Sequence, residues 1–484
     1  MIKVYTNKEN YQNDIHSLIK AFYPEQEVKI YDMNFVEQEE HCSLVIVQFL
    51  ENRLEVFFDI KFNDNSKKEY TNVYKNDIRV TKDTYKLSFY EDLCDYTGKT
   101  LPWGNLTGIR PTKLSMGMLA EGMYEEEIVR QLEVSHAVSK EKAKLSIDIA
   151  KREQHILSSM HYKDGYSLYI GIPFCPTTCL YCSFTSYPIA AWQKHIPAYL
   201  QALFQELDFT AKLYQNKILD TIYIGGGTPT SLDADALELL LAKVHETFDL
   251  SQIKEFTVEA GRADSITREK LDVLKKYGIT RISINPQTMK EETLQCIGRR
   301  HTVAQVKEAF SMARSVGFDN INMDIILGLP GELETDVQFT LDEIKKLNPD
   351  SLTVHSLAVK RASHLCQWIE ENGMTTLRNT NVTMEIASKG ARELEMKPYY
   401  LYRQKNMAGN FENVGYAKKG KYGIYNILIM EEVQTIVALG AGTITKRVYP
   451  DGRIKRCDSV KDVALYIEKI DEMIERKRRL LEEV

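Results

Sequence analysis

The chain has 484 residues, which is more than one domain usually contains, so we expect two or three domains. Hydrophobic residues make up 43% of the chain and charged residues 27%, and the net charge of −6 is spread over interleaved signs, which excludes a basic nucleic-acid-binding stripe. No apolar run is long enough to span a membrane, and the N-terminus lacks the apolar core of a secretion signal. We therefore expect a cytoplasmic protein with reduced cysteines and with no membrane or nucleic-acid partner.

Residues 1–160 are predicted to form an α+β accessory domain. Short segments in which apolar and polar residues alternate predict strands at 44–49, 54–62 and 85–90. From residue 111 to 155 the apolar residues repeat with a helical period, which predicts helices. In the segment NLTGIRPTKL, Arg110 lies next to a proline, which favours a turn before a helix. The alternative is that Arg110 faces an active site and binds substrate carboxylates.

Three cysteines follow an apolar segment that predicts a buried strand at 167–172. Cys175, Cys179 and Cys182 are spaced C-x3-C-x2-C. A structural zinc ion needs four ligands, usually in two pairs, but the other cysteines of the chain are scattered singly. A redox pair of Cys179 and Cys182 would leave Cys175 without a role. Three thiolates suit a [4Fe–4S] cluster in which one iron stays open to a ligand, with zinc and redox sites as the alternatives.

A loop of this spacing after an apolar strand resembles the radical S-adenosylmethionine (SAM) superfamily. The resemblance implies that the three cysteines ligate a [4Fe–4S] cluster, whose open iron is chelated by the amino and carboxylate groups of SAM. One electron from the cluster then cleaves SAM to methionine and a 5′-deoxyadenosyl radical. In such enzymes the cofactors carry the chemistry and the protein orients them. The resemblance also implies a low-potential electron donor, such as flavodoxin or ferredoxin.

From residue 166 on, predicted strands and helices alternate. The apolar segments predict strands at 168–172, 220–224, 254–258, 280–284, 321–327 and 351–357. The segments between them predict helices, for example at 193–215, 234–247, 267–277 and 303–316. Regular alternation indicates an α/β fold with parallel strands, and six units suit a (β/α)6 partial barrel over 161–375, which the resemblance also implies. Ligands of such folds bind at the carboxyl ends of the strands.

The segment GGGTPT follows the second strand of this predicted barrel. Glycines allow the backbone to approach a ligand closely and expose its amide groups. A phosphate-binding P-loop is disfavoured because no Lys-Ser or Lys-Thr pair follows. The resemblance implies that Gly226, Gly227 and Thr228 contact the amino group of SAM.

Polar residues also follow the third, fourth and fifth predicted strands. Glu259, Gln287 and Asp324 stand at these strand ends, and Arg299 lies in IGRRH. Taken singly, a polar residue at such a place is usually a cap. Taken together, their order from about 166 to 446 resembles the oxygen-independent coproporphyrinogen III oxidase family, in its HemZ-type branch. The resemblance implies SAM contacts from Tyr169, Tyr181, Glu259, Gln287, Arg299, Asp324 and the backbone of Ala358, with Tyr169 and Arg299 as candidate catalytic residues and Glu259 accepting the ribose hydroxyls.

Residues 376–484 are predicted to form a C-terminal α+β cap. The resemblance places this region over the barrel mouth, with the segment Gly440, Ala441 and Gly442 near the cofactor. The last residues, 460–484, predict a charged amphipathic helix without chemistry of its own.

The implied activity is the oxidative decarboxylation of two propionates of coproporphyrinogen III to vinyl groups, which gives protoporphyrinogen IX in haem (porphyrin) biosynthesis. A tetracarboxylate needs cationic partners, and the candidates are Arg110, Arg299, Arg300, Arg403 and Lys405. Phe184 stands where the best-known oxidases of the family carry a further cysteine, and an aromatic residue there is usual in the related haem chaperones. A haem-binding chaperone and a radical SAM enzyme that opens the haem ring anaerobically therefore remain the alternatives.

Overall fold

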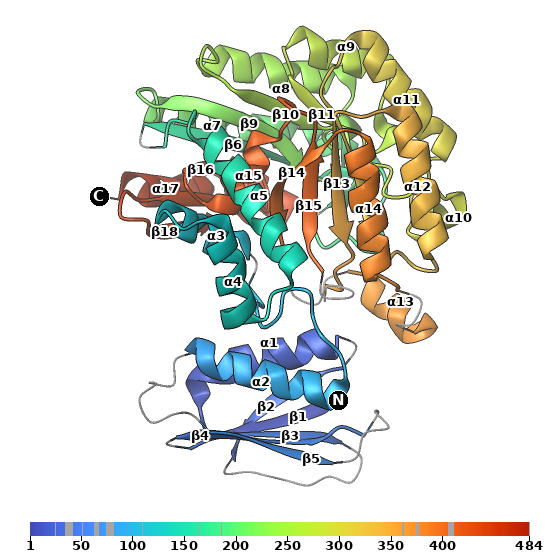
Figure 1. Cartoon of the computed structure of the whole chain (residues 1–484). Helices are drawn as coiled ribbons and strands as arrows, with labels where there is room; N and C mark the ends of the chain where they lie inside the picture. Colours follow the sequence, from blue (N-terminus) through green and yellow to red (C-terminus); the bar gives the residue numbers. More distant parts are fainter. Residues whose placement is uncertain are drawn as a thin grey trace. The chain divides into compact units, whose positions relative to one another are not determined.

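The computed structural model of the chain describes residues 1–24, 26–33, 42–50, 52–61, 67–73, 82–108, 110–162, 164–184, 186–360, 363–373, 377–404 and 411–483. Two compact units are present (Figure 1). Unit 1 contains Met1–Lys151 and Tyr402–Glu412, and unit 2 contains Arg152–Leu401 and Asn413–Val484. Within the described ranges, none of the helices combines the length and the apolar character that a membrane crossing requires.

Unit 1 contains a five-stranded sheet with the strand order β2-β1-β3-β4-β5. The strands are β1 (Ile2–Thr6), β2 (Val28–Asp32), β3 (Ser43–Phe49), β4 (Arg53–Asp59) and β5 (Lys68–Val73). Helices α1 (Gln12–Phe22) and α2 (Lys82–Thr97) lie on one face of this sheet and form its apolar core with it (Figure 1). Three further helices follow, namely α3 (Thr112–Ala120), α4 (Glu125–His136) and α5 (Lys140–Leu157). The predicted strand at 44–49 and the predicted helices after residue 111 are confirmed. The strand predicted at 54–62 is confirmed as far as residue 59, where β4 ends, and residue 62 lies outside the described residues.

The predicted strand at 85–90 is wrong, because this segment is part of helix α2. The apolar residues Tyr85, Leu87 and Phe89 alternate as they would in a strand. However, Tyr85 and Phe89 also begin a series spaced by three or four residues, and its members Tyr85, Phe89, Leu93 and Tyr96 are all buried in the core of unit 1. The side chains of this segment therefore pack into the core with the spacing of a helix and not with the alternation of a strand.

Unit 2 is organised around an eleven-stranded sheet, and its six central parallel strands are the strands that the sequence predicts. They are β6 (Gly165–Ile172), β9 (Ile218–Gly226), β10 (Glu255–Glu259), β11 (Arg281–Ser283), β12 (Ile321–Leu327) and β13 (Ser351–Ser356). Their residues are largely buried, as expected for parallel strands that are covered by helices.

Helices connect these strands and lie around the outside of the sheet (Figure 1). They are α6 (Ile189–Trp192), α7 (Ile196–Leu213), α8 (Ala234–Thr247), α9 (Arg268–Lys276), α10 (Glu291–Cys296), α11 (Val303–Val316), α12 (Glu334–Leu347) and α13 (Leu365–Asn372). Local sequence fixes several helix ends. The Asp233 side chain accepts a hydrogen bond from the Ala236 amide at the start of α8, and Gly317 ends α11 with a left-handed φ of 97°.

The C-terminal region extends both edges of the same sheet. At one edge, β15 (Asn413–Ala417) runs antiparallel to β13, and β14 (Lys397–Tyr402) follows it. At the other edge, β16 (Ile436–Leu439) pairs with β6, followed by β17 (Ile444–Val448) and β18 (Ile454–Asp458). The helices of this region are α14 (Asn381–Glu393), α15 (Ile424–Glu431), α16 (Val463–Glu468) and α17 (Ile470–Glu482). The separation of a barrel at 161–375 from a cap at 376–484 stays a prediction.

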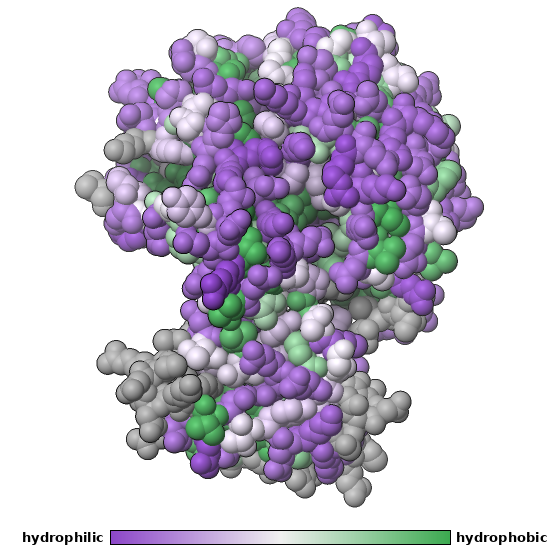
Figure 2. All heavy atoms as spheres, viewed as in Figure 1, coloured by the Kyte–Doolittle hydropathy of each residue, from purple (hydrophilic) through white to green (hydrophobic). Residues whose placement is uncertain are grey.

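Hydrophilic side chains cover most of the face of unit 2 that Figure 2 shows, and apolar residues come through only in small groups. The apolar side chains of β6 and β9–β13, by contrast, are mostly buried. This segregation is the usual one for a sheet that is enclosed by amphipathic helices.

A buried ion pair ties the C-terminal helix to the interior of unit 2. The carboxylate of Glu206 in α7 is fully buried and accepts hydrogen bonds from the Lys477 ammonium of α17, the Tyr466 hydroxyl (2.5 Å) and the Gly440 amide (2.7 Å). The Tyr199 hydroxyl accepts from the Ala441 amide (3.2 Å). Lys477 therefore compensates the buried charge that holds the turn at 440–442. The predicted amphipathic helix is confirmed in α17, and the ion pair of Lys477 is a structural role that the sequence did not indicate.

Replacing Lys477 by methionine should destabilise unit 2, because Glu206 would keep a buried charge without its partner. We expect a loss of about 3–5 kcal/mol in the free energy of unfolding, which is typical for breaking a buried pair on one side. Arg479→Met is the control, since the Arg479 side chain on the same helix is 77% exposed and pairs only with Glu475. Denaturant unfolding of the full chain measures both variants, and equal stability of the two would contradict the role of Lys477.

Candidate active site

The three cysteines lie on the loop between β6 and α6. Phe174–Cys175 forms a short strand, β7, which pairs in parallel with β8 (Tyr187–Pro188). The Cys182 amide donates to the Cys179 carbonyl (3.1 Å), so that the second and third cysteines share one turn. Cys179 is buried, and Cys175 and Cys182 are half-buried.

Backbone hydrogen bonds hold this loop against two other segments of the site. The Gly227 amide donates to Ile172 O (2.8 Å), and the Thr228 amide donates to Phe174 O (2.7 Å). On the other side, the Leu180 amide donates to Ile297 O (3.0 Å), at the end of α10. The loop is therefore fixed by bonds that do not depend on its side chains.

Glycine is required in the segment after β9. Gly226 has a φ of 109°, which favours glycine. A Cβ atom on Gly227 would lie 2.6 Å from the carbonyl oxygen of Phe174, and a Cβ atom on Gly225 would lie 2.9 Å from the Glu259 carboxylate. The glycines therefore allow the backbone after β9 to lie directly against the cysteine loop and the end of β10.

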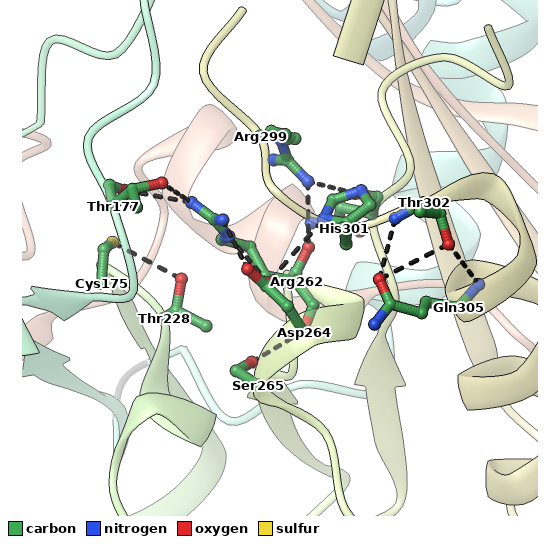
Figure 3. Close-up of polar contacts among 12 residues, drawn as sticks. Cys175, Thr177, Thr228, Arg262, Asp264, Ser265, Arg299, His301, Thr302 and Gln305 are labelled. Carbon is green, nitrogen blue, oxygen red and sulfur yellow. Dashed lines mark hydrogen bonds and ion pairs between the residues drawn. The ribbon is translucent and has the colours of Figure 1, made fainter. Parts of the chain in front are cut away.

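Arg262 braces the cysteine loop from the segment after β10 (Figure 3). Its guanidinium is almost fully buried and donates to the carbonyl (3.1 Å) and hydroxyl (2.6 Å) oxygens of Thr177. It also binds both carboxylate oxygens of Asp264, at 3.0 and 2.7 Å. Burial opposes ionisation of Asp264, but His301, whose Nδ1 lies 3.7 Å from Oδ1, and the hydrogen bonds from Arg262 outweigh it and lower the pKa of this carboxyl.

Two of the thiols on this loop, those of Cys175 and Cys182, have raised pKa values. Burial raises the pKa of Cys175 to about 11, against the hydrogen bond from Thr228 (Sγ–Oγ1 3.5 Å) and the charge of Arg262. Burial also raises the pKa of Cys182. Metal binding at these thiols must therefore displace protons.

The donor set fits an iron–sulfur cluster. The described residues contain no three His, Cys, Asp or Glu side chains that could hold a single metal ion together, and this includes the three cysteines. A four-iron cluster does not require such a shared ion, because each thiolate binds its own iron. The Cys179 and Cys182 thiols are close enough to Cys175 to raise its pKa, and Cys179 also raises the pKa of Cys182, as expected for neighbouring ligands of one small cluster.

Arg299 lies on the opposite side of the cysteine loop from β7. Its buried guanidinium donates to Asn285 O (2.6 Å) and to the Tyr181 hydroxyl (3.1 Å). Burial disfavours the charge of Arg299, but Tyr181 and Cys179 outweigh it and raise the pKa of the guanidinium. Its Nε has no hydrogen-bond partner. A charged donor with unused capacity beside the cluster loop suits a carboxylate of the cofactor.

Glu259 ends β10 and lies beside two stacked tyrosines. Its carboxylate accepts a hydrogen bond from the hydroxyl of Tyr223, whose ring stacks on that of Tyr169 with a centroid distance of 6.1 Å. Burial raises the pKa of Glu259 to about 7, and the charge of Asp324 adds to the rise, whereas Tyr223, the Gly226 amide and His355 oppose it. Glu259 is therefore an acceptor whose charge changes near neutral pH.

Buried polar groups without partners gather near the ends of β11 and β12. Gln287 has a φ of 68°, which is unusual for a residue other than glycine, and its backbone is held by Asp324 O (2.9 Å) and the Ile326 amide (2.9 Å). The side-chain oxygens of Gln287, Asn285 and Ser283 are buried without a hydrogen-bond partner. Such groups are costly unless a ligand or water satisfies them. They fit a polar cofactor such as SAM.

The surroundings of Asp324 in β12, in the same region, favour the charged form of its carboxyl. Burial opposes its ionisation, but the hydrogen bond and the charge of His355 outweigh it, together with Asn322 at 2.6 Å, and lower the pKa of the carboxyl. It therefore stays charged where Glu259 titrates.

Most of the predicted cofactor residues lie close to one another in the structure, in two groups of contacts, and others lie apart from these groups. Tyr169, Gly226 and Glu259 form one group of contacts, and Tyr181 and Arg299 form another with Cys179. Ala358 follows the end of β13 and is half-buried. The SAM contacts of all these residues stay proposals.

The predicted substrate cations are dispersed. Arg110 and Arg403 belong to unit 1, where Arg403 is buried and donates to Leu106 O. Arg300 lines a pocket of 510 Å³ together with Thr177 and Thr178 of the cysteine loop. Lys405 lies outside the described residues.

Sequence reasoning missed three residues of the site, namely Tyr223, Arg262 and His355. Tyr223 lies directly opposite Tyr169 in the register of β9 and β6, and His355 is the second-last residue of β13, with its Nε2 3.7 Å from Asp324 Oδ2. Parallel register could have indicated both, because neighbouring strands end at one edge. Arg262 stands three residues after Glu259 and carried no signal beyond that position.

The comparisons with known proteins agree with this geometry. The family model of the Radical SAM superfamily matches residues 169–344. The oxygen-independent coproporphyrinogen-III oxidase-like protein HemZ of Bacillus subtilis (strain 168) is 42% identical over 415 residues, which are 85% of this chain and 83% of that protein. The heme chaperone HemW of the same strain is 38% identical over 195 residues, 40% of this chain and 51% of the chaperone.

Among solved structures, the coproporphyrinogen III oxidase HemN from Escherichia coli matches with a TM-score of 0.52 and 21% identity. The match covers 66% of this chain and 73% of that chain. The predicted α/β fold of the radical SAM type is therefore confirmed.

Replacing Cys179 by alanine should abolish the cluster, because only two thiolates would remain on the loop. We expect the reconstituted protein to lose its brown absorbance and all cleavage of SAM, which chromatography of 5′-deoxyadenosine measures. Cys457→Ala, in β18, is the matched control and should keep both. If the Cys179 variant retained both properties, the proposed ligand set would be wrong.

The affinity for SAM should depend on the ionisation of Glu259. Because the pKa of Glu259 is about 7, the carboxylate that can accept two ribose hydroxyls is present above pH 7 and is lost below it. We expect the affinity to fall by up to about tenfold per pH unit below neutrality. In Glu259→Gln this contribution should disappear and binding should be weaker, with the cluster intact. Calorimetric titration across pH checks this, and identical profiles for the two proteins would remove Glu259 from the site.

Proposed function

Because the chain belongs to the radical SAM superfamily, and within it to the HemZ-type branch of the oxygen-independent coproporphyrinogen III oxidase family, we propose that it decarboxylates coproporphyrinogen III. Its cofactors are a [4Fe–4S] cluster and SAM. The product of two such steps on two propionates is protoporphyrinogen IX.

The observation that carries this proposal is the similarity to HemZ over 85% of the chain. That similarity extends well beyond residues 169–344, where the superfamily model matches. The match of residues 169–344 to the superfamily model supports the cofactor chemistry of that superfamily. The similarity to HemZ outside these residues supports the substrate class that the name of HemZ gives.

When they are bound, the cluster and SAM supply a 5′-deoxyadenosyl radical. We assign the three cysteines to the cluster, Arg299 to the carboxylate of SAM and Glu259 to its ribose. Gly226, Gly227 and Thr228 are assigned to its amino group, and Tyr169, Tyr181, Gln287, Asp324 and Ala358 line the remainder of the pocket. These residues orient the radical source and exclude water from it.

The reaction that we propose begins with loss of a hydrogen atom from the β-carbon of a propionate. The Cα–carboxyl bond of the resulting carbon radical then breaks, carbon dioxide leaves, and one electron passes to an acceptor. The remaining two carbons form the vinyl group. The protein must therefore hold the β-carbon beside the radical source, and cationic groups on the carboxylates serve this purpose.

A haem-binding chaperone is the second candidate. Phe184 replaces the further cysteine of the best-known oxidases and is 69% exposed, and the similarity to HemW covers 40% of the chain. Binding of haem in equal amount to the protein, without any vinyl product, would favour this function. Loss of haem with consumption of SAM would favour anaerobic ring opening.

Anaerobic turnover tests the proposal. The reconstituted protein is mixed with SAM, a reductant and coproporphyrinogen III, and protoporphyrinogen, carbon dioxide and 5′-deoxyadenosine are quantified. We expect vinyl product in excess of the protein, and none from Cys179→Ala. Formation of 5′-deoxyadenosine without decarboxylation would contradict the proposed substrate and keep the radical SAM chemistry.

A further inference from the structure

A lysine that the sequence did not single out lies beside the cysteine loop. Lys360 follows the carboxyl end of β13, at the edge of the sheet where the cofactor residues gather. Its backbone carbonyl accepts hydrogen bonds from the Ser363 amide (3.0 Å), the Ser363 hydroxyl (2.7 Å) and the Cys366 thiol (3.3 Å). The backbone from which this side chain extends is therefore well anchored.

The ammonium group of Lys360 stands over the ring of Phe184, with 5.4 Å between Nζ and the ring centroid. The ring is 69% exposed and follows Cys182 by two residues. A cation and an exposed aromatic face therefore adjoin the cysteine loop at one point.

This ammonium has no carboxylate to neutralise it within the described part of the chain. It is half-buried. A partly desolvated cation without an anion is unfavourable by itself and gains from an anionic ligand. Lys421 differs in this respect, because it forms an ion pair with Asp319 (3.1 Å).

The neighbouring wall is apolar. Leu180 and Tyr181 of the cysteine loop pack with Val359 and Trp368 against a buried cluster that includes Leu357. A ligand at this point therefore meets one positive charge, one free aromatic face and an apolar border. That combination suits a flat aromatic molecule with a carboxylate arm, because the ring system can stack while the arm reaches the ammonium.

We propose that Lys360 and Phe184 form the subsite that receives one propionate carboxylate of the tetrapyrrole, with the macrocycle edge against the phenyl ring. This assignment rests on the proposed function and names a specificity residue for it. It also gives Phe184 a role at the position where related oxidases carry a cysteine. The carboxylate contacts of Arg110, Arg299, Arg300, Arg403 and Lys405 stay predictions beside this one.

Binding of a porphyrin that cannot react tests this assignment. The full chain with its reconstituted cluster is titrated with coproporphyrin III and, separately, with its tetramethyl ester, and the fluorescence of the porphyrin reports the affinity. We expect Lys360→Gln to bind coproporphyrin III about tenfold more weakly, as for loss of one charge-assisted hydrogen bond. Lys360→Arg should remain close to the parent protein, and Lys421→Gln is the matched surface control.

The tetramethyl ester separates charge from packing. Its affinity should be the same in the parent protein and in Lys360→Gln, because no carboxylate is present, and it should fall in Phe184→Ala, because the stacking face is lost. The cluster absorbance of each variant reports that it is folded and loaded.

Two results would overturn the assignment in different ways. Equal affinity of the parent protein and Lys360→Gln for coproporphyrin III would exclude Lys360 and leave the proposed function intact, and slower reduction of the cluster by flavodoxin in that same variant would assign the lysine to an acidic electron donor. If the parent protein did not bind coproporphyrin III at all, the proposed function would fail together with the subsite.

Discussion

The backbone hydrogen bonds around the cysteine loop are the constraint on which the site depends. The amides of Gly227, Thr228 and Leu180 fix both ends of the loop before any cofactor is present. This close approach is possible only because the segment after β9 lacks side chains where a Cβ atom would meet the loop. The order of the sheet follows from the same requirement, since β6 and β9 must be neighbours for the loop and the glycines to meet.

The burial of charged groups is a second constraint on the site. Thiols, carboxylates and guanidinium groups are all enclosed at one sheet edge, and burial alone would neutralise each of them. Arg262 and Arg299 reduce that cost for the cysteine loop, while Glu259 keeps a raised pKa and titrates near neutrality. The charges of these groups are therefore not balanced by the protein alone. The cluster and SAM bring further charges that complete the balance.

Local sequence was enough to predict the six central strands, most of their helices and the cysteine loop, because each depends on residues close together in the chain. It was not enough for the segment 85–90, where two periods competed and the core of unit 1 selected the helical one. Lys477, Arg262 and Lys360 were missed for a different reason. Their partners, Glu206, Thr177 and Phe184, are distant in sequence, and only the fold brings them together.

The central claim is that three thiolates hold a cluster whose fourth iron position is open to SAM. Electron paramagnetic resonance of the reduced, reconstituted protein, recorded with and without SAM, tests this most directly. We predict a [4Fe–4S] signal whose g values change when SAM is added, because SAM becomes a ligand of the open iron. Identical spectra in the two samples would show that the cluster has no such position and would contradict the account.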